Sequence, residues 1–185
     1  MRIAVLGSGA GSNFLALWKA CHAGKIAGEI SLVGADQQNA GILEQAEARN
    51  IPTFFAKKGK DFSERVAQRL LEENIELVCL AGLMQIVKAP LLGAFPNRIL
   101  NIHPSLLPKF PGKEAWKQAL EAREDETGCT VHYVDAGMDT GEIILQERVP
   151  IKTDDTPESL HARIQEAEHR VYVESVRTVI SSLTD

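Results

Sequence analysis

The stretch MRIAVLGSGAGSN, residues 1–13, joins a short apolar run to a glycine-rich turn and the start of a helical pattern. Residues 2–6 are typical of a β-strand, and residues 13–23 place apolar side chains at helical spacing before Gly24. A strand that passes through glycines directly into a helix is the opening unit of an α/β sheet. Backbone N–H groups in such a turn, together with the positive end of the helix, favour an anion. The turn is therefore a candidate phosphate site.

Two named nucleotide motifs fit this turn poorly. The dinucleotide fingerprint GxGxxG requires glycine where Ser12 stands, and the P-loop requires a lysine that is absent here. Asp36 follows the second predicted strand, close to where dinucleotide-binding folds carry a ribose-binding acid. A dinucleotide site therefore stays open as an alternative, as does a turn that only lets the helix pack on the sheet.

Outward from this turn, strand and helix patterns alternate. Further strands are predicted at residues 29–33, 76–81, 98–103, 128–135 and 142–149, and further helices at 42–48, 61–74, 114–121 and 156–181. Asp61 opens a predicted capping box, and Thr156 is a predicted N-cap before Pro157. This order predicts an α/β fold, a Rossmann-like and mostly parallel sheet with helices on both faces and an antiparallel C-terminal portion.

Composition narrows the function classes. The chain has 185 residues, 44% hydrophobic and 24% charged, which fits one globular domain spanning residues 1–185. The net charge of −5 lacks the basic excess that nucleic-acid binding uses, so no nucleic-acid partner is expected. No apolar stretch reaches membrane length, the first apolar run is too short for a signal peptide, and the three cysteines form no CxxC pair. We therefore expect a cytoplasmic protein without a membrane partner.

The segment NIHPSLLPKFPG, Asn101 to Gly112, carries the strongest chemical signal. Asn101 and His103 are two apart at the end of a predicted strand, so their side chains point to the same face. The carboxyl ends of parallel strands open into the ligand crevice, and an amide beside an imidazole there can stabilise an oxyanion and move a proton. The alternative is a histidine that only satisfies loop backbone.

The segment VDAGMDTGEII, residues 134–144, supplies a carboxylate that can orient His103 and favour its charged form at neutral pH. The residues alone do not choose between Asp135 and Asp139, and local turn chemistry is an alternative for both. A metal site built from His103, His132 and Asp139 is a weaker alternative, because no ligand-spacing motif supports it. His132 alternates with Val131 and Tyr133 on a predicted strand, so the simpler interpretation is a residue on one face of that strand and not a metal ligand.

These motifs, together with AGLM at residues 81–84, resemble the phosphoribosylglycinamide formyltransferase family, the folate-dependent enzymes of purine biosynthesis. The resemblance runs from Met1 to about Tyr172. It implies an α/β formyltransferase domain whose residues 1–100 hold the phosphate and ribonucleotide and whose residues 101–185 form the catalytic and folate-binding half. It also implies small-molecule substrates, with 10-formyltetrahydrofolate as co-substrate, no metal, and a monomer or homodimer.

The resemblance assigns roles to individual positions. The implied catalytic residues are Asn101, His103 and Asp139. The implied ribonucleotide-binding residues are Gly11, Ser12, Asn13, Gln165 and Glu168. The implied folate-binding residues are Met84, Gln85, Ile86, Val87, Asp135, Ala136, Gly137, Met138 and Asp139.

The implied reaction is direct formyl transfer to the glycinamide amine of 5′-phosphoribosylglycinamide, in de novo purine (IMP) biosynthesis. Asn101 and His103 would stabilise the oxyanion, and Asp139 would tune His103. Trp116 departs from the family, which commonly has histidine there, so no acceptor contact is assigned to that loop. The alternatives are a related formyltransferase acting on a sugar-nucleotide amine and a non-catalytic nucleotide-binding module.

Overall fold

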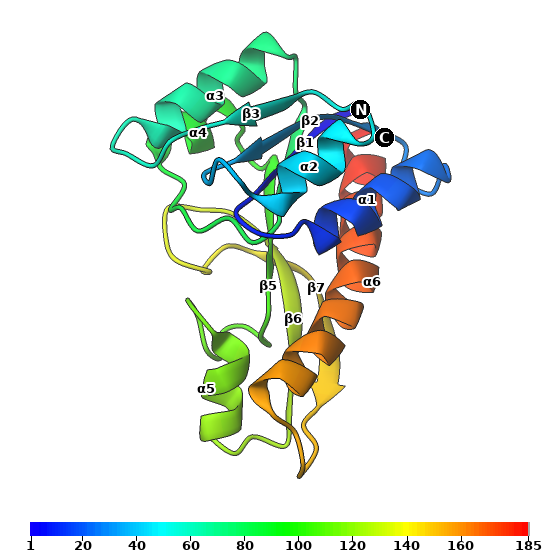
Figure 1. The fold of residues 1–185 in the computed structure, drawn as a ribbon, viewed down its shortest axis with the longest axis vertical. Coiled ribbons are helices and arrows are strands. Elements are labelled where there is room, and N and C mark those ends of the chain that lie inside the picture. The colour runs from blue at the N-terminus through cyan, green and yellow to red at the C-terminus, as the bar shows by residue number, and fades with distance from the viewer. Residues whose placement is uncertain (185) are drawn as a thin grey trace.

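The computed structural model describes residues 1–184. Its strands form one seven-stranded sheet in the order β3-β2-β1-β4-β5-β6-β7 (Figure 1). Its parallel part consists of β1 (Arg2–Gly7), β2 (Glu29–Ala35), β3 (Thr53–Phe55), β4 (Leu77–Leu80) and β5 (Ile99–His103). Its antiparallel part consists of β6 (Glu126–Tyr133) and β7 (Ile143–Pro150). The mostly parallel sheet with an antiparallel C-terminal portion is confirmed.

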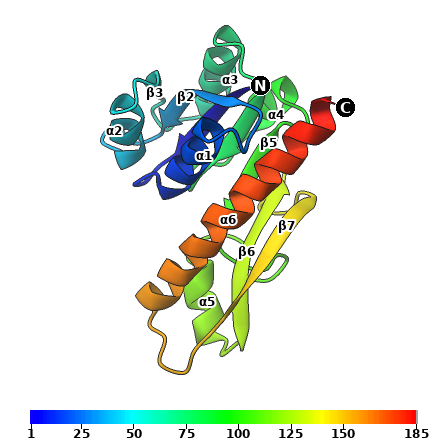
Figure 2. The same ribbon diagram turned by 90° about the vertical axis from the view of Figure 1, so that its right-hand side faces the viewer.

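Helices cover both faces of the sheet, as predicted. One face is covered by α1 (Ser12–His22), α2 (Gly41–Glu47), α5 (Ala115–Glu121) and α6 (Pro157–Thr184), and the other by α3 (Phe62–Glu72) and α4 (Ala89–Ala94). Figure 2 shows α6 running diagonally past α1 and along β6 and β7, so one helix packs against both the parallel and the antiparallel part. Within residues 1–184, no helix is long and apolar enough to cross a membrane.

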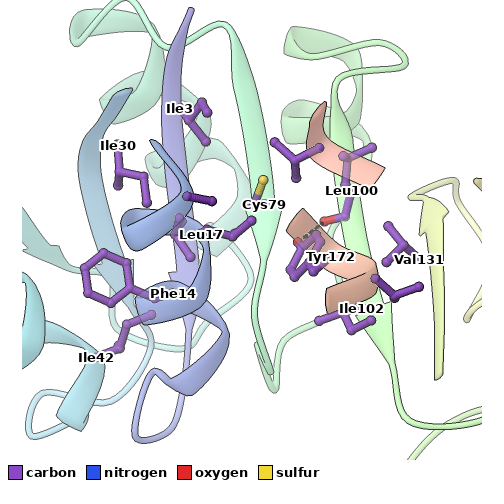
Figure 3. Packing of buried hydrophobic residues seen from close by; sticks show 14 of the residues in the cluster. Ile3, Phe14, Leu17, Ile30, Ile42, Cys79, Leu100, Ile102, Val131 and Tyr172 are labelled. Carbon is purple, nitrogen blue, oxygen red and sulfur yellow. Dashed lines mark hydrogen bonds between the residues drawn. The ribbon is translucent and has the colours of Figure 1, made fainter. Parts of the chain in front are cut away.

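The larger hydrophobic core lies between the sheet and the α1, α2 and α6 layer (Figure 3). Tyr172 on α6 is fully buried there, and its hydroxyl donates to the carbonyls of Leu80 and Leu100 at 2.8 and 3.2 Å. These carbonyls belong to β4 and β5, so one side chain ties α6 to two neighbouring strands. Leu100 and Ile102 point into this core. The residues that alternate with them, Asn101 and His103, therefore face the opposite side of the sheet.

The termini of two helices test the predicted caps. The α6 cap is confirmed, because the backbone N–H of Ser159 donates to Thr156 Oγ1 at 3.2 Å. The α3 cap is wrong: the Asp61 side chain makes no capping hydrogen bond and pairs instead with Arg65 at 2.9 Å. A guanidinium one turn along the helix competes with the backbone for the same carboxylate. The sequence pattern also misses β3 and α4, which are too short to show a period.

Candidate active site

The candidate site is built at the carboxyl end of β5. Asn101 is partly buried, and His103 is only 5% exposed. The segment that follows, residues 104–112, folds back so that the Phe110 carbonyl lies 2.9 Å from His103 Nε2. A carbonyl oxygen can only accept, so Nε2 carries a proton and Nδ1 is the ring nitrogen available as a base when the ring is neutral.

Asp139, not Asp135, is the carboxylate beside His103. Asp139 Oδ2 lies 3.4 Å from His103 Nδ1 and accepts the backbone N–H of Gly112 at 2.8 Å. Asp135 is exposed, and its Oδ1 accepts from the Gly137 backbone and the Thr140 hydroxyl, which is the local turn chemistry considered above. The geometry thus separates two carboxylates that the residues alone left equivalent.

The protonation of this pair differs from the sequence expectation. Burial lowers the pKa of His103, and the backbone contact with Phe110 and the charge of Asp139, which both raise it, do not compensate. Burial would raise the pKa of Asp139, but the contact with His132, the hydrogen bond from the Gly112 backbone and the nearby His103 imidazole outweigh burial and lower it. Asp139 acts on His103 in the predicted direction. The expectation that it keeps His103 charged at neutral pH is nevertheless wrong, because His103 is too deeply buried.

His132 belongs to the same cluster, which the sequence interpretation as a simple strand-face residue missed. It lies directly opposite Asn101 in the β5–β6 pairing and is 2% exposed. Its Nε2 is 3.2 Å from Asn101 Nδ2 and 3.6 Å from Asp139 Oδ1. The only signal in the sequence was the alternation of polar residues on β6, which cannot reveal the register against β5. Within residues 1–184, no group of three or more His, Cys, Asp or Glu side chains has a geometry that could hold a metal ion.

A buried hydrogen-bond network supports the loop after His103. Thr130 Oγ1 on β6 donates to the Ser105 carbonyl at 2.7 Å and accepts from the Leu107 N–H at 3.1 Å. Gln146 Nε2 on β7 lies 2.8 Å from the same hydroxyl and 2.9 Å from the Leu107 carbonyl. Two strands therefore hold this loop, and the carbonyl that orients His103, in one arrangement.

The glycine turn after β1 forms a second polar group. Gly11 has φ 87° and precedes α1, whose first two residues are Ser12 and Asn13. Asn13 Nδ2 donates to Glu168 Oε2 at 2.9 Å, although 155 residues separate them. Burial raises the pKa of Glu168 to about 7, partly offset by this hydrogen bond. Gln165 lies one helical turn before Glu168 and is partly exposed.

Apolar side chains lie exposed near both groups. Met84, Ile86 and Met138 are 58, 63 and 57% exposed. The Met84 N–H donates to Ser8 Oγ at 2.7 Å, which ties the segment after β4 to the glycine turn. A Cβ placed on Gly112 would lie 3.5 Å from Met138 Sδ, so that side chain lies over the loop after β5. Exposed flexible thioethers of this kind suit the face of a flat ring system.

The other implied folate residues occupy different environments. Gln85 is partly buried and donates to the Met84 carbonyl at 2.8 Å, and Ala136 and Gly137 are exposed in the loop before Asp139. Val87 is 6% exposed within the smaller core, so its side chain is not available to a ligand.

Three features considered from the sequence lie outside this site. Asp36 is buried and pairs with Lys58 at 3.4 Å, so the ribose-binding acid of a dinucleotide site is occupied by a lysine. Trp116 stacks on His161 of α6 with ring centroids 3.9 Å apart, so it joins two helices. The sugar-nucleotide alternative gains no support from that residue. A groove of about 700 Å³ beside α5 is lined by none of the site residues.

Comparisons with known proteins agree on one family. The formyl transferase family profile matches residues 1–176. The structure of glycinamide ribonucleotide transformylase 1 from Symbiobacterium toebii is 47% identical, with a TM-score of 0.94 over 96% of this chain and 86% of that one. Phosphoribosylglycinamide formyltransferase from Bacillus halodurans is 42% identical, with a TM-score of 0.94 over 98% of this chain and 96% of that one.

A curated relative is much longer. The trifunctional purine biosynthetic protein adenosine-3 of Drosophila melanogaster is 42% identical over 97% of this chain, which spans 14% of the length of that relative.

Proposed function

The chain belongs to the formyl transferase family, and on that premise we propose that it transfers the formyl group of 10-formyltetrahydrofolate to the glycinamide amine of 5′-phosphoribosylglycinamide. This reaction is a step of de novo purine (IMP) biosynthesis. The observation that carries the proposal is the convergence of Asn101, His103 and Asp139 at the end of β5. The names of two solved structures that are similar in sequence and shape, a glycinamide ribonucleotide transformylase and a phosphoribosylglycinamide formyltransferase, support the same acceptor.

The chemistry follows from the positions of the polar atoms. The amine nitrogen attacks the formyl carbon, and the carbonyl electron pair moves to oxygen, where an Asn101 N–H donates to the developing oxyanion. His103 starts neutral, and its Nε2–H donates a hydrogen bond to the Phe110 carbonyl. Nδ1 takes the proton released by the amine, and the resulting imidazolium is stabilised by Asp139 Oδ2. The proton then passes to N10 of the folate as the carbon–N10 bond breaks.

The substrates would occupy the two remaining groups. The backbone N–H groups of Gly11, Ser12 and Asn13 lie at the start of α1 and suit the 5′-phosphate. Glu168 and Gln165 on α6 would contact the rest of the ribonucleotide, since Asn13 already pairs with Glu168. The net charge of −5 cannot attract this anion, so the local N–H groups and the helix end must do so.

The folate would lie on the side of the catalytic residues that is opposite the ribonucleotide. The proposed contacts are the side chains of Met84, Gln85, Ile86, Ala136 and Met138, and the backbone of Val87, Asp135 and Gly137. The exposed thioethers supply the apolar part of this surface. The loop of residues 135–139 would close over the pterin of the folate, while Asp139 holds His103.

The test is His103→Ala in an assay that follows folate release. Removal of the imidazole is expected to lower kcat by at least roughly 10²-fold, because base and charge stabilisation are both lost. Binding of the ribonucleotide, measured by calorimetry, should stay within about twofold, since His103 lies away from the glycine turn. His22→Ala on the exposed end of α1 is the matched control. Undiminished turnover in the His103 variant would refute the mechanism.

A further inference from the structure

His132 lies where it can control the Asn101 amide. It is the direct cross-strand partner of Asn101, and its pairing with β7 is interrupted by a register shift between Val131 and His132. The extra residue, Ile144, belongs to β7, and a bulge of this kind increases the local twist of the strand pair and is common beside active sites. The ring is 2% exposed, so its hydrogen bonds are made within the protein and not with bulk water.

The backbone fixes which nitrogen of His132 carries the proton. Nδ1 lies 2.8 Å from the carbonyl oxygen of Tyr133, which can only accept. Nδ1 therefore carries the hydrogen, and Nε2 of the neutral ring presents a lone pair. Gly141 makes room for this arrangement, because a Cβ there would lie 1.7 Å from the same Tyr133 carbonyl.

The lone pair of Nε2 then selects one orientation of the Asn101 amide. Nε2 is 3.2 Å from Asn101 Nδ2, which donates one of its two hydrogens. The reversed amide would place its oxygen against the same lone pair, and two acceptors would face each other inside the protein. The favoured orientation, with Nδ2 toward His132, leaves the second N–H of Asn101 free to donate to another acceptor.

The Asp139 carboxylate determines which protonation state of His132 can orient the Asn101 amide. Its Oδ1 is 3.6 Å from His132 Nε2, and His103 lies on the other side of the same carboxylate. A protonated His132 would donate to Asp139 and could no longer accept from Asn101. The orienting role therefore belongs to the neutral ring.

We propose that His132 is a positioning residue, which locks the Asn101 amide so that one N–H points to the formyl oxygen as negative charge develops there. This inference rests on the proposed function, since it needs Asn101 as the oxyanion donor. His132 itself need not touch substrate. Its contribution appears in kcat, because the oriented N–H matters only when the oxyanion forms.

The experiment compares His132→Leu with His132→Gln. Loss of an oxyanion donor costs about 10²–10³-fold in kcat, so a misoriented donor in His132→Leu should cost at least about tenfold. KM for the ribonucleotide should change by less than about twofold. Gln offers a carbonyl oxygen to Asn101 Nδ2 and should recover a large part of kcat. His161→Leu, which removes a histidine near the start of α6 that stacks on Trp116, is the matched control.

A double-mutant cycle separates this role from a merely structural one. If His132 acts through Asn101, then His132→Leu should cause no further loss in an Asn101→Ala background. A loss of the same size in both backgrounds would overturn the inference, as would a His132→Leu enzyme within twofold of the parent. Absence of formyl transfer by the parent enzyme would instead overturn the proposed function.

A direct measurement tests the inference without turnover. Long-range ¹⁵N–¹H correlation spectra report which ring nitrogen of His132 is protonated. The Nδ1–H form is the expected tautomer of the neutral ring in the ligand-free protein. An Nε2–H form would show that His132 cannot accept from Asn101 and would overturn the inference.

Discussion

Replacement of Glu168 by Gln is expected to stabilise the protein at alkaline pH. Glu168 is 6% exposed on α6, and its oxygen accepts from Asn13 Nδ2 at 2.9 Å. Burial raises the pKa of its carboxyl from 4.5 to about 7, despite that hydrogen bond. At about 1.4 kcal/mol per pKa unit, ionisation of this buried group costs roughly 3 kcal/mol of folding free energy.

The sign follows from proton binding. Between pH 4.5 and about 7 the folded protein holds a proton on Glu168 that the unfolded chain has released. The free energy of unfolding therefore falls as pH rises through this window, and the full penalty applies above it. Gln cannot ionise, but its carbonyl oxygen can still accept from Asn13. The variant removes the penalty and keeps the contact.

The assay is urea unfolding of both proteins at about pH 5 and about pH 8.5. The variant should be more stable than the parent by less than about 1 kcal/mol at the lower pH and by roughly 3 kcal/mol at the higher pH. Glu166→Gln, an exposed carboxyl two residues earlier on the same helix, is the matched control and should show little pH-dependent difference. A Glu168 difference that is equal at both pH values would refute the reasoning.

Three further variants test other parts of the structure. Asp139→Asn keeps the acceptor for Gly112 but removes the charge that raises the pKa of His103, so NMR titration should find that pKa lower still; an unchanged titration would contradict the electrostatic account. Gly11→Ala forces a Cβ to 2.9 Å from Ile42 Cα at φ 87°, so ribonucleotide affinity and Tm should both fall, while Gly9→Ala, with no atom within 4 Å, should change neither; equal effects would contradict the steric argument. Tyr172→Phe removes the hydroxyl that donates to two strand carbonyls and should cost about 0.5–1.5 kcal/mol in urea unfolding, and an unchanged free energy of unfolding would contradict the anchoring role.

The parts of the fold that the sequence predicts well are those with local causes. The strand, glycine turn and helix at residues 1–23 follow from local pattern, and so do the Thr156 cap and the antiparallel pair of β6 and β7. β3 and α4 escape prediction because three and six residues are too few to show a period. Asp61 shows the limit of capping rules, since a tertiary or helical partner can take the same carboxylate.

The site is only partly readable from the sequence for a related reason. Asn101 and His103 share a face because alternation along one strand is local. The contacts of Asp139 and His132 depend on a loop path and on the β5–β6 register, which no local pattern encodes. The residues name a carboxylate partner for His103, but burial, which dominates its pKa, becomes known only from the packed structure.

The most direct test of the central claim is the acceptor specificity of the purified protein. Release of folate from 10-formyltetrahydrofolate would be followed with 5′-phosphoribosylglycinamide and, in parallel, with a sugar-nucleotide amine. The account predicts turnover with the ribonucleotide, loss of that turnover in His103→Ala, and none above background with the sugar nucleotide. Turnover with the sugar nucleotide alone would contradict it.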